Sequence, residues 1–452
     1  MKYIQESPRS IPVMAETEVL VVGSGPAGLA AAISASREGV ETMLVEQYGC
    51  FGGNITQVGV NSIAWYRYEG TTDVEGIGIE FEQRAQALSG KQSTPFESSD
   101  LLDTEMFKYV ADQLVQEANI TPLLHCYVVD TILEGDTIKG VITESKSGRR
   151  AILAERVIDA SGDADLAVLS GAPYHKTPKD EMLGVTVMFS CSGVNINRFL
   201  GHVGENPATF KDWTGNWNIK TTGKEDDLFS PYLQEPFDKA RQDGMIPPEM
   251  TSIGGTWSRL TDAGEALGLN MIYMFGYDGS DVHDLTRGEI DGRHQAVLAI
   301  EVLRKYVPGF EDARLGHFGM KLGTRDTRVI KGRYAMTEYD VRNQARFEDS
   351  IGIFPEFLDG YGVLVLPTTG RYFQVPYGIL VPEKVENLLV AGRCVSGDKL
   401  SHAALRSMIC CTVTGQGAGV AAALSLKDGV NTGEVDINRL QTALKKQGVR
   451  LE

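Results

Sequence analysis

The chain has 452 residues, of which 43 are Lys or Arg and 60 are Asp or Glu, so its formal net charge is −17. This acidity opposes binding to nucleic acid and to anionic membrane surfaces, because both depend on basic side chains. An apolar fraction of 42% and a charged fraction of 23% exclude a disordered chain and a coiled coil. The 50 glycines exceed the usual share of about 7%, and several of them stand in motifs.

The sequence lacks the usual signals for a membrane span, for export and for metal binding. No run approaches the roughly 18 to 20 consecutive apolar residues that cross a membrane. Residues Met1 to Glu6 lack the apolar core of a signal peptide. We therefore expect a cytoplasmic protein that contacts no membrane. The six cysteines include no C-x-x-C pair, so we expect no metal site.

The first predicted elements form a βαβ unit. Glu18 to Val22 is a short, valine-rich run that is typical of a buried parallel strand. Leu29 to Glu38 is rich in alanine and favours a helix, which Gly39 ends. Thr42 to Val45 is predicted as the second strand. Such a unit is typical of the start of a dinucleotide-binding domain.

The turn between this strand and this helix has the sequence Gly23-x-Gly25-x-x-Gly28, and Glu46 ends the second strand. The first glycine permits a sharp turn, the second lets a pyrophosphate approach the backbone, and the third lets helix and strand pack closely. The helix N-terminus adds unpaired N–H groups and a positive dipole end. A carboxylate at Glu46 can accept hydrogen bonds from ribose hydroxyls and would repel a phosphate. The motif therefore predicts a nucleotide site for a bare ribose.

A β-meander is predicted after an amphipathic helix at Thr104 to Asn119. Its three strands cover Thr121 to Leu133, Thr137 to Ser145 and Ala151 to Ala160, with turns at Gly135-Asp136 and Ser147-Gly148. A glycine turn at Gly162 follows the last strand and can contact a cofactor again. Because a meander replaces continued βα alternation, this segment favours FAD over NAD.

The middle of the chain, residues 178–384, mixes strands with helices such as Gly288 to Tyr306. We predict it to be a mixed α+β domain that covers the substrate. Three of the four tryptophans, Trp213, Trp217 and Trp257, lie in it.

The βα pattern returns from Val385 onward. Asn387 to Val390 is predicted as a strand, Ala391 to Arg393 as a tight turn, and Ala404 to Leu426 as a long helix. The expected fold class is α/β. A Rossmann-like FAD-binding domain with an inserted β-meander would consist of residues 1–177 and 385–452, on either side of the substrate domain.

Blocks that recur along almost the whole chain carry a family resemblance. They are Val21 to Ala32, Val45-Glu46 with Gly52 to Asn54, Val157 to Gly171, Leu285 to Arg293, Val307 to Phe310, Thr324 to Arg328, Gly332 to Tyr334, Thr337 to Asp340, Gln374 to Tyr377 and Asn387 to Ala423. The sequence resembles FAD-dependent oxidoreductases with the glutathione-reductase-type fold. It is most similar to the bacterial family called "FAD dependent oxidoreductase". The resemblance implies the fold and the cofactor FAD, but not the substrate.

The same resemblance implies roles for particular residues. Gly23, Ser24, Gly25, Pro26, Ala27 and Gly28 would hold the pyrophosphate, Glu46 and Gln47 the adenosine ribose, and Val128 the adenine, while Gly53, Asn54, Gly162 and Gly392 would lie along the cofactor. Arg406, Ser407 and Met408 would face the pyrimidine end of the flavin, where a helix dipole stabilises negative charge on the reduced ring.

The chain lacks the redox cysteines of related disulfide reductases, which argues against thiol chemistry. In those enzymes a pair of redox cysteines follows the double glycine, whereas this chain has Ile55 and Val60 at the two positions. A second strand-bound G-x-G-x-x-G for NADPH is also missing, because Gly415-x-Gly417-x-Gly419 stands in a helical pattern. A disulfide reductase is therefore not expected.

His402 is the predicted acid or base, because histidine titrates near neutrality and precedes the last helix. The alternative is that it only hydrogen-bonds the flavin or caps that helix.

Arg325 is the second predicted catalytic residue. It forms a basic cluster with Arg328 and Arg333 that either binds a substrate carboxylate or neutralises nearby acids, which are Asp326, Glu338 and Asp340. Cys50 is interpreted as a structural thiol, with a covalent flavin link as the alternative. Trp65, Tyr66 and Tyr68 either wall the substrate pocket or pack in the core.

The predicted function is a dehydrogenase or reductase that acts on a small organic molecule by hydride transfer through flavin N5. A flavin monooxygenase is an alternative, although such enzymes usually have a Gly-Asp-Ala-type turn where this chain has Ala391-Gly392-Arg393. A non-catalytic electron-transfer subunit is the other alternative. The electron acceptor stays unknown, and a homo-oligomer stays open.

Overall fold

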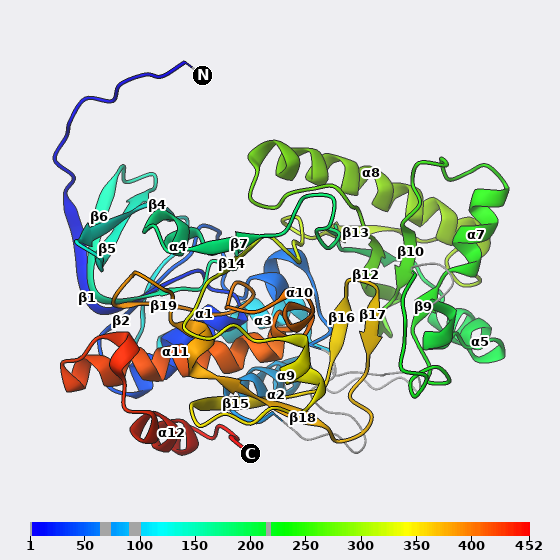
Figure 1. Cartoon of the computed structure of the whole chain (residues 1–452). Coiled ribbons are helices and arrows are strands. Elements are labelled where there is room, and N and C mark those ends of the chain that lie inside the picture. Colours follow the sequence, from blue (N-terminus) through cyan, green and yellow to red (C-terminus); the bar gives the residue numbers. More distant parts are fainter. Residues whose placement is uncertain (1, 64–73, 90–100, 214–217) are drawn as a thin grey trace.

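The structure is a computed structural model that describes residues 2–63, 74–89, 101–213 and 218–452. Two β-sheets organise the chain, one in its N-terminal part and one in its middle (Figure 1).

The first sheet contains seven strands within the described residues. They are β1 (Val13–Val22), β2 (Thr42–Val45), β3 (Thr121–Leu123), β4 (Tyr127–Glu134), β5 (Thr137–Glu144), β6 (Arg150–Asp159) and β19 (Leu388–Val390). Their order is β3-β2-β1-β6-β5-β4, and β19 also pairs with β6. Strands β3, β2, β1, β6 and β19 are parallel to their neighbours, while β4, β5 and β6 form an antiparallel meander. The predicted Rossmann-like fold with a β-meander is therefore confirmed.

Strand β6 belongs to both parts of this sheet. One edge pairs with β1 from Ala151 to Asp159. The other edge is divided, because β5 pairs with Arg150 to Leu153 and β19 pairs with Val157 to Asp159. The C-terminal part of the chain thus completes a sheet that the N-terminal part begins.

Successive apolar side chains of strand β1 point to opposite faces of the sheet, and both faces are covered by other parts of the protein. Val19 and Val21 point into a core shared with the helices α1 (Pro26–Arg37), α3 (Thr104–Glu117) and α11 (Met408–Asp428). Leu20 and Val22 point to the opposite face, where the meander and α4 (Asp165–Leu169) cover them. Because neither face is exposed, this strand is an almost continuous apolar run.

The second sheet has the order β13-β8-β12-β10-β9, and β11 also pairs with β12. Its strands are β8 (Phe189–Ser192), β9 (Tyr232–Leu233), β10 (Ile253–Thr256), β11 (Arg259–Thr261), β12 (Glu265–Ile272) and β13 (Arg314–Phe318). The long helix α8 (Val282–Tyr306) lies across it, with α5 (Ile196–Glu205) and α7 (Glu235–Gln242) nearby (Figure 1). Apolar residues between Val185 and Leu322 form its core.

The other described elements are mostly short. They are α2 (Ile77–Ser89), β7 (Tyr174–Lys176), β14 (Arg328–Ile330), α9 (Glu338–Arg342), β15 (Ser350–Pro355), β16 (Leu358–Gly360), β17 (Val363–Val365), β18 (Tyr372–Pro376), α10 (Lys399–Leu405) and α12 (Ile437–Lys446), with short turns of helix at η1 (Asn54–Val58), η2 (Phe210–Asp212), η3 (Tyr377–Leu380) and η4 (Thr432–Glu434). Apolar side chains between Met336 and Val381 pack into the first core. The domain boundaries at 177 and 384 stay a prediction.

Two of the predicted elements differ from those observed. The strand expected over Thr121 to Leu133 is divided into β3 and β4, because the backbone turns at His125, whose φ is +54°. The helix expected over Ala404 to Leu426 is also divided. It begins as α10 and restarts as α11 after Arg406 and Ser407, where Ser407 has an extended ψ of 135°.

Helix α11 is long and apolar enough to cross a membrane, and among the described helices it alone meets that test. However, 94% of its most apolar window is buried inside the protein. It packs against α1, β6 and β15 at the centre of the first core. We therefore interpret it as a core helix.

Candidate active site

The three glycines of the motif have the three different environments that their roles require. Gly23 has a φ of +94°, and a Cβ there would lie 2.4 Å from the Ala160 oxygen. A Cβ on Gly28 would lie 1.8 Å from the Gly23 oxygen. In contrast, the nearest atom to a Cβ on Gly25 is the Cα of Gly53, at 3.9 Å. The outer glycines are thus needed for the fold, while Gly25 leaves space for a ligand.

Glu46 lies beside this loop at the end of β2. It is 5% exposed, and its Oε2 accepts hydrogen bonds from the backbone N–H of Ser24 at 3.0 Å and from the Ser24 hydroxyl at 2.6 Å. Its backbone carbonyl accepts from Cys126, two residues before Val128 at the start of β4. Gln47 is exposed. The structure therefore places Glu46 at the glycine loop and Val128 in the nearby strand β4, and their roles toward the ribose and the adenine stay predictions.

The double glycine packs directly on the same loop. Gly52 donates its N–H to the Ser24 carbonyl at 2.8 Å. A Cβ on Gly53 would lie 2.5 Å from the Cα of Gly25, so a larger residue would close the space beside Gly25. Asn54 then begins the single π-helical turn η1.

The turns after β6 and β19 complete the groove. Gly392 donates its N–H to the Thr414 hydroxyl of α11 at 3.0 Å. Next to it, Arg393 donates to Asp163 Oδ1 at 2.7 Å and lies against Gly162. The other terminal nitrogen of Arg393 is buried with no partner among the described residues. An unpartnered guanidinium nitrogen of this kind indicates a missing acceptor, which an anionic cofactor can supply.

Helix α11 approaches α1 very closely through its glycines. Cβ atoms on Gly415 and Gly419 would lie 2.1 and 2.2 Å from the oxygens of Ala27 and Ala31. The G-x-G-x-G pattern thus permits helix packing, which agrees with its predicted helical position. The N-cap residue of α11, Ser407, makes no side-chain cap hydrogen bond. The first N–H groups of α11 are therefore free to stabilise negative charge.

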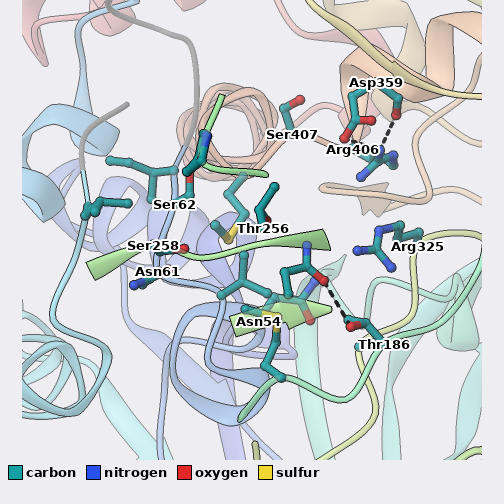
Figure 2. A pocket seen from close by; sticks show the side chains of 18 of the residues that line it. Asn54, Asn61, Ser62, Thr186, Thr256, Ser258, Arg325, Asp359, Arg406 and Ser407 are labelled. Carbon is teal, nitrogen blue, oxygen red and sulfur yellow. Dashed lines mark hydrogen bonds and ion pairs between the residues drawn. The ribbon is translucent and has the colours of Figure 1, made fainter. Parts of the chain in front are cut away.

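A central cavity of about 250 Å³ lies between the two sheets. The residues that line it are Asn54, Val60, Asn61, Ser62, Ile63, Leu101, Thr186, Met188, Phe210, Trp213, Pro231, Thr256, Trp257, Ser258, Asn270, Gly323, Thr324, Arg325, Phe357, Asp359, Arg393, Arg406, Ser407 and Met408. In Figure 2, Arg325 and Arg406 lie on one side of this space, and Asn61 and Ser258 lie on the opposite side.

The predicted arginine cluster is separated by the fold. Arg328 forms an ion pair with Asp165, and Arg333 donates to the Gly433 carbonyl. Neither bonds to the acids expected from the sequence. Arg325 instead donates to the Gly184 carbonyl at 2.8 Å and lines the central cavity. Of the three, only Arg325 lies where a ligand can reach it.

His402 occupies a different place from the one expected. It lies in α10, is 3% exposed, and is not among the residues that line the central cavity. Its Nε2 lies 3.0 Å from the Arg325 carbonyl and must donate to it, because a carbonyl only accepts. Burial lowers the pKa of His402 to about 4, so the ring is neutral. This hydrogen bond to the chain itself is neither a bond to the flavin nor a helix cap, and the acid or base role stays a prediction.

Among the described residues, Cys50 is not among those that line the central cavity. Cys50 is partly buried near Thr56 and Met320, and burial raises its thiol pKa. Trp65, Tyr66, Tyr68 and Trp217 lie outside the described residues.

The cavity residues that the second sheet supplies were not predicted from the sequence. Asn270 and Thr256 line the cavity from β12 and β10, and Asn270 accepts from the Thr186 hydroxyl at 3.1 Å. The paired glycines of β10 were an available signal, since glycine inside a strand often marks a close backbone approach. A Cβ on Gly255 would lie 2.3 Å from the Asn270 oxygen.

These features together fit FAD. The groove offers space beside Gly25, a buried carboxylate, an unpartnered arginine nitrogen and the uncapped end of α11.

Comparison with known proteins gives the same family. The sequence model of the family described as FAD dependent oxidoreductase matches residues 18–444. A thiamine thiazole synthase of Methanococcus vannielii is 27% identical over 197 residues, which cover 40% of this chain and 69% of that protein.

Solved structures are similar at low identity. A geranylgeranyl bacteriochlorophyll reductase-like protein from Thermoplasma acidophilum is 13% identical, with 97% of this chain and 85% of the other covered and a TM-score of 0.48. A p-nitrophenol 4-monooxygenase from Pseudomonas putida is 13% identical, with 96% and 84% covered and a TM-score of 0.42. At these identities the likeness concerns the fold alone.

Proposed function

Because the chain belongs to the FAD dependent oxidoreductase family, we propose that it oxidises or reduces a small organic molecule by hydride transfer. The protein is an enzyme, and FAD is its cofactor. When bound, FAD accepts or donates a hydride at its flavin N5. The observation that carries the proposal is the central cavity, which the uncapped end of α11 borders on one side and the second sheet on the other.

The residues of the chain hold the two reactants in defined positions. The glycine loop and Glu46 fix one end of the cofactor, and the first N–H groups of α11 favour negative charge at the other end. Trp257 and Phe357 form apolar walls that limit the access of water to the cavity. Asn61 and Asn270 supply polar groups that can orient a substrate.

Asp359 replaces His402 as the candidate for moving a proton. It is the carboxylate that lines the central cavity within the described part of the chain. Its Oδ2 accepts a hydrogen bond from Arg406 at 3.1 Å, which fixes the orientation of the carboxyl group. A carboxylate in this position can take a proton from a substrate while the hydride leaves on the other side.

The cavity also favours a dehydrogenase or reductase over an electron-transfer subunit. A subunit that only passes electrons needs a flavin edge close to a partner surface. Here polar side chains such as Thr186 and Arg325 converge instead on a space that accommodates a small molecule. A monooxygenase uses the same kind of cavity, so oxygen consumption must distinguish it.

The proposal is tested by anaerobic mixing of the purified holoprotein with a metabolite library. Bleaching of the flavin absorbance by one class of compounds is expected. Asp359→Asn should slow this reduction about 100-fold or more with FAD still bound, while His402→Gln should change it less. Oxygen uptake coupled to a hydroxylated product would show a monooxygenase instead. If the substrate reduces the flavin of the Asp359→Asn variant at the wild-type rate, Asp359 does not transfer a proton in the reaction.

A further inference from the structure

A second cavity of about 240 Å³ adjoins the central one. The two share six lining residues, which are Trp213, Thr256, Asn270, Arg325, Asp359 and Arg406. A molecule that reaches from one cavity into the other therefore passes between these side chains. The remaining walls of the second cavity contain none of the groups that we assign to the cofactor.

Aromatic and aliphatic side chains dominate the walls of the second cavity. Tyr232, Tyr273 and Tyr361 line it together with Leu183 and Val363. Phe275 also lines it and is 55% exposed, so it lies at the rim toward solvent. The ring of Trp213 is held between those of Phe210 and Tyr232, at centroid distances of 5.5 and 5.1 Å. Walls of this composition favour the ring or chain of an apolar group.

Arg325 is held at the junction of the two cavities. One terminal nitrogen donates to the Gly184 carbonyl, and the guanidinium lies 4.7 Å from the centroid of the Tyr273 ring. His402 donates to the backbone carbonyl of the same residue. The side chain is thus anchored on the side of the second cavity and is not free to turn away.

Two guanidinium groups, those of Arg325 and Arg406, meet one carboxylate, that of Asp359, at this junction, so its charge is not balanced. The two other acids on the walls of the second cavity, Asp180 and Glu181, are exposed, and Glu181 pairs with Lys399. Arg406 is paired with Asp359, whereas no carboxylate of a described residue forms an ion pair with Arg325. Arg325 is half-buried, and burial lowers the pKa of its guanidinium. A guanidinium in such a place is stabilised by an anion with two acceptor oxygens.

We propose that the protein acts on a carboxylate with an apolar, ring-bearing body, which lies in the second cavity while Arg325 binds its carboxylate group. This inference rests on the proposed function, because it names the substrate class of the same site. Arg325 is then the residue that determines specificity for the anionic group. The reacting carbon of such a substrate would point from the junction into the central cavity.

The test measures binding calorimetrically in the oxidised holoprotein, without turnover. The probes are benzoate, phenylacetate and 3-phenylpropionate, each with its primary amide, and acetate as an acid that lacks a ring. At least one aryl acid should bind ten times more tightly than both its amide and acetate. Arg325→Gln should weaken binding of that acid about 10- to 100-fold, as expected for loss of a charge-assisted pair. The affinity for the amide should change little, and Arg325→Lys should restore part of the loss.

Two further variants separate the cavity from the charge. Val363→Trp should fill the second cavity and weaken binding of the aryl acid, but it should leave acetate unchanged. Arg333→Gln, an arginine loss outside both cavities, should change neither. Equal affinity for acids and amides, no binding of any aryl acid, or an unaffected Arg325→Gln variant would overturn the inference. FAD content and melting temperature identify a variant that has not folded. Flavin bleaching in the metabolite screen tests the proposed function separately, because these binding measurements require no electron transfer.

Discussion

The two walls of the central cavity are built in different ways. On the cofactor side, the surface of the glycine loop is mainly backbone, and the shape of the loop at Gly23, Gly25 and Gly28 determines what fits. On the other side, the contacts come from side chains of a sheet, such as Asn270 and Thr256. A backbone surface accepts one ligand and tolerates few substitutions, whereas side chains can be exchanged while the sheet stays intact. The fold therefore determines which cofactor binds, whereas replaceable side chains determine which substrate binds.

The largest effect is expected at the contact between α11 and α1, the helix that follows the glycine loop. In Gly415→Ala, the new methyl group would lie 2.1 Å from the Ala27 oxygen, so α11 and α1 must separate. We expect the free energy of unfolding to fall by about 3 kcal/mol or more, with loss of FAD. Urea denaturation and flavin fluorescence measure the two effects. Wild-type stability in this variant would contradict the backbone interpretation of this wall.

The next effect concerns His402, which donates a hydrogen bond to the carbonyl of Arg325 in the wall of the central cavity. Its pKa is lowered from about 6.5 to about 4, so the unfolded chain takes up a proton before the folded protein does. The free energy of unfolding should therefore fall by up to about 3 kcal/mol as the pH decreases from about 6.5 to about 4. His402→Gln should remove this part of the pH dependence.

Asp165 is the internal control for that measurement. Burial raises its pKa to about 6, so its contribution has the opposite sign and falls as the pH rises between about 4 and 6. Because both proteins contain Asp165, this contribution cancels in the difference between them. An unchanged pH profile in His402→Gln would mean that His402 is not a neutral buried ring.

Gly25→Ala distinguishes ligand space from fold at the cofactor wall. Gly25 has a φ of −64°, and its nearest neighbour would be 3.9 Å from the new methyl group, so the protein without FAD should fold normally. FAD affinity should fall about tenfold or more, since the methyl group occupies the place of the pyrophosphate. Equilibrium dialysis of the apoprotein measures this. If stability rather than affinity is lost, Gly25 serves the fold like its neighbours.

The smallest effect is predicted for a glycine that touches nothing. Gly201 lies inside α5, and a Cβ there would meet no atom within 4 Å. Gly201→Ala should therefore stabilise the protein by about 0.5 to 1 kcal/mol, through helix propensity and the unfolded chain. Thermal denaturation checks the sign. A destabilised Gly201→Ala variant would show that close approach is not what separates these glycines.

The cofactor side could be predicted from the sequence because its signals are local. The strand, the Gly23 to Gly28 turn, the helix and Glu46 follow one another within a short segment, and each has a backbone reason. The break at Arg406-Ser407 could not be predicted, because no proline or glycine marks it. For the break at His125, Pro122 inside the expected strand was an available signal.

The second wall was predicted only as a region that covers the substrate. Its lining residues come from distant strands, and side chains such as Asn270 look ordinary in their local sequence. His402 was predicted to face the flavin because it precedes the last helix. The extra helix α10 turns it instead toward Arg325. The direction of the His402 side chain depends on how several elements pack together, and no local sequence pattern predicts it.

The divided edge of β6 has a consequence for the order of synthesis. One part of that edge is paired by β5 soon after it leaves the ribosome, but the other part waits for β19, more than 200 residues later. Until then the strand has unpaired backbone groups, and neither Gly392 nor α11 is in place. A growing chain therefore exposes an incomplete sheet and has no complete cofactor site. Chains that end at Pro382 should retain no FAD on gel filtration. FAD should therefore bind only after the whole chain has been synthesised.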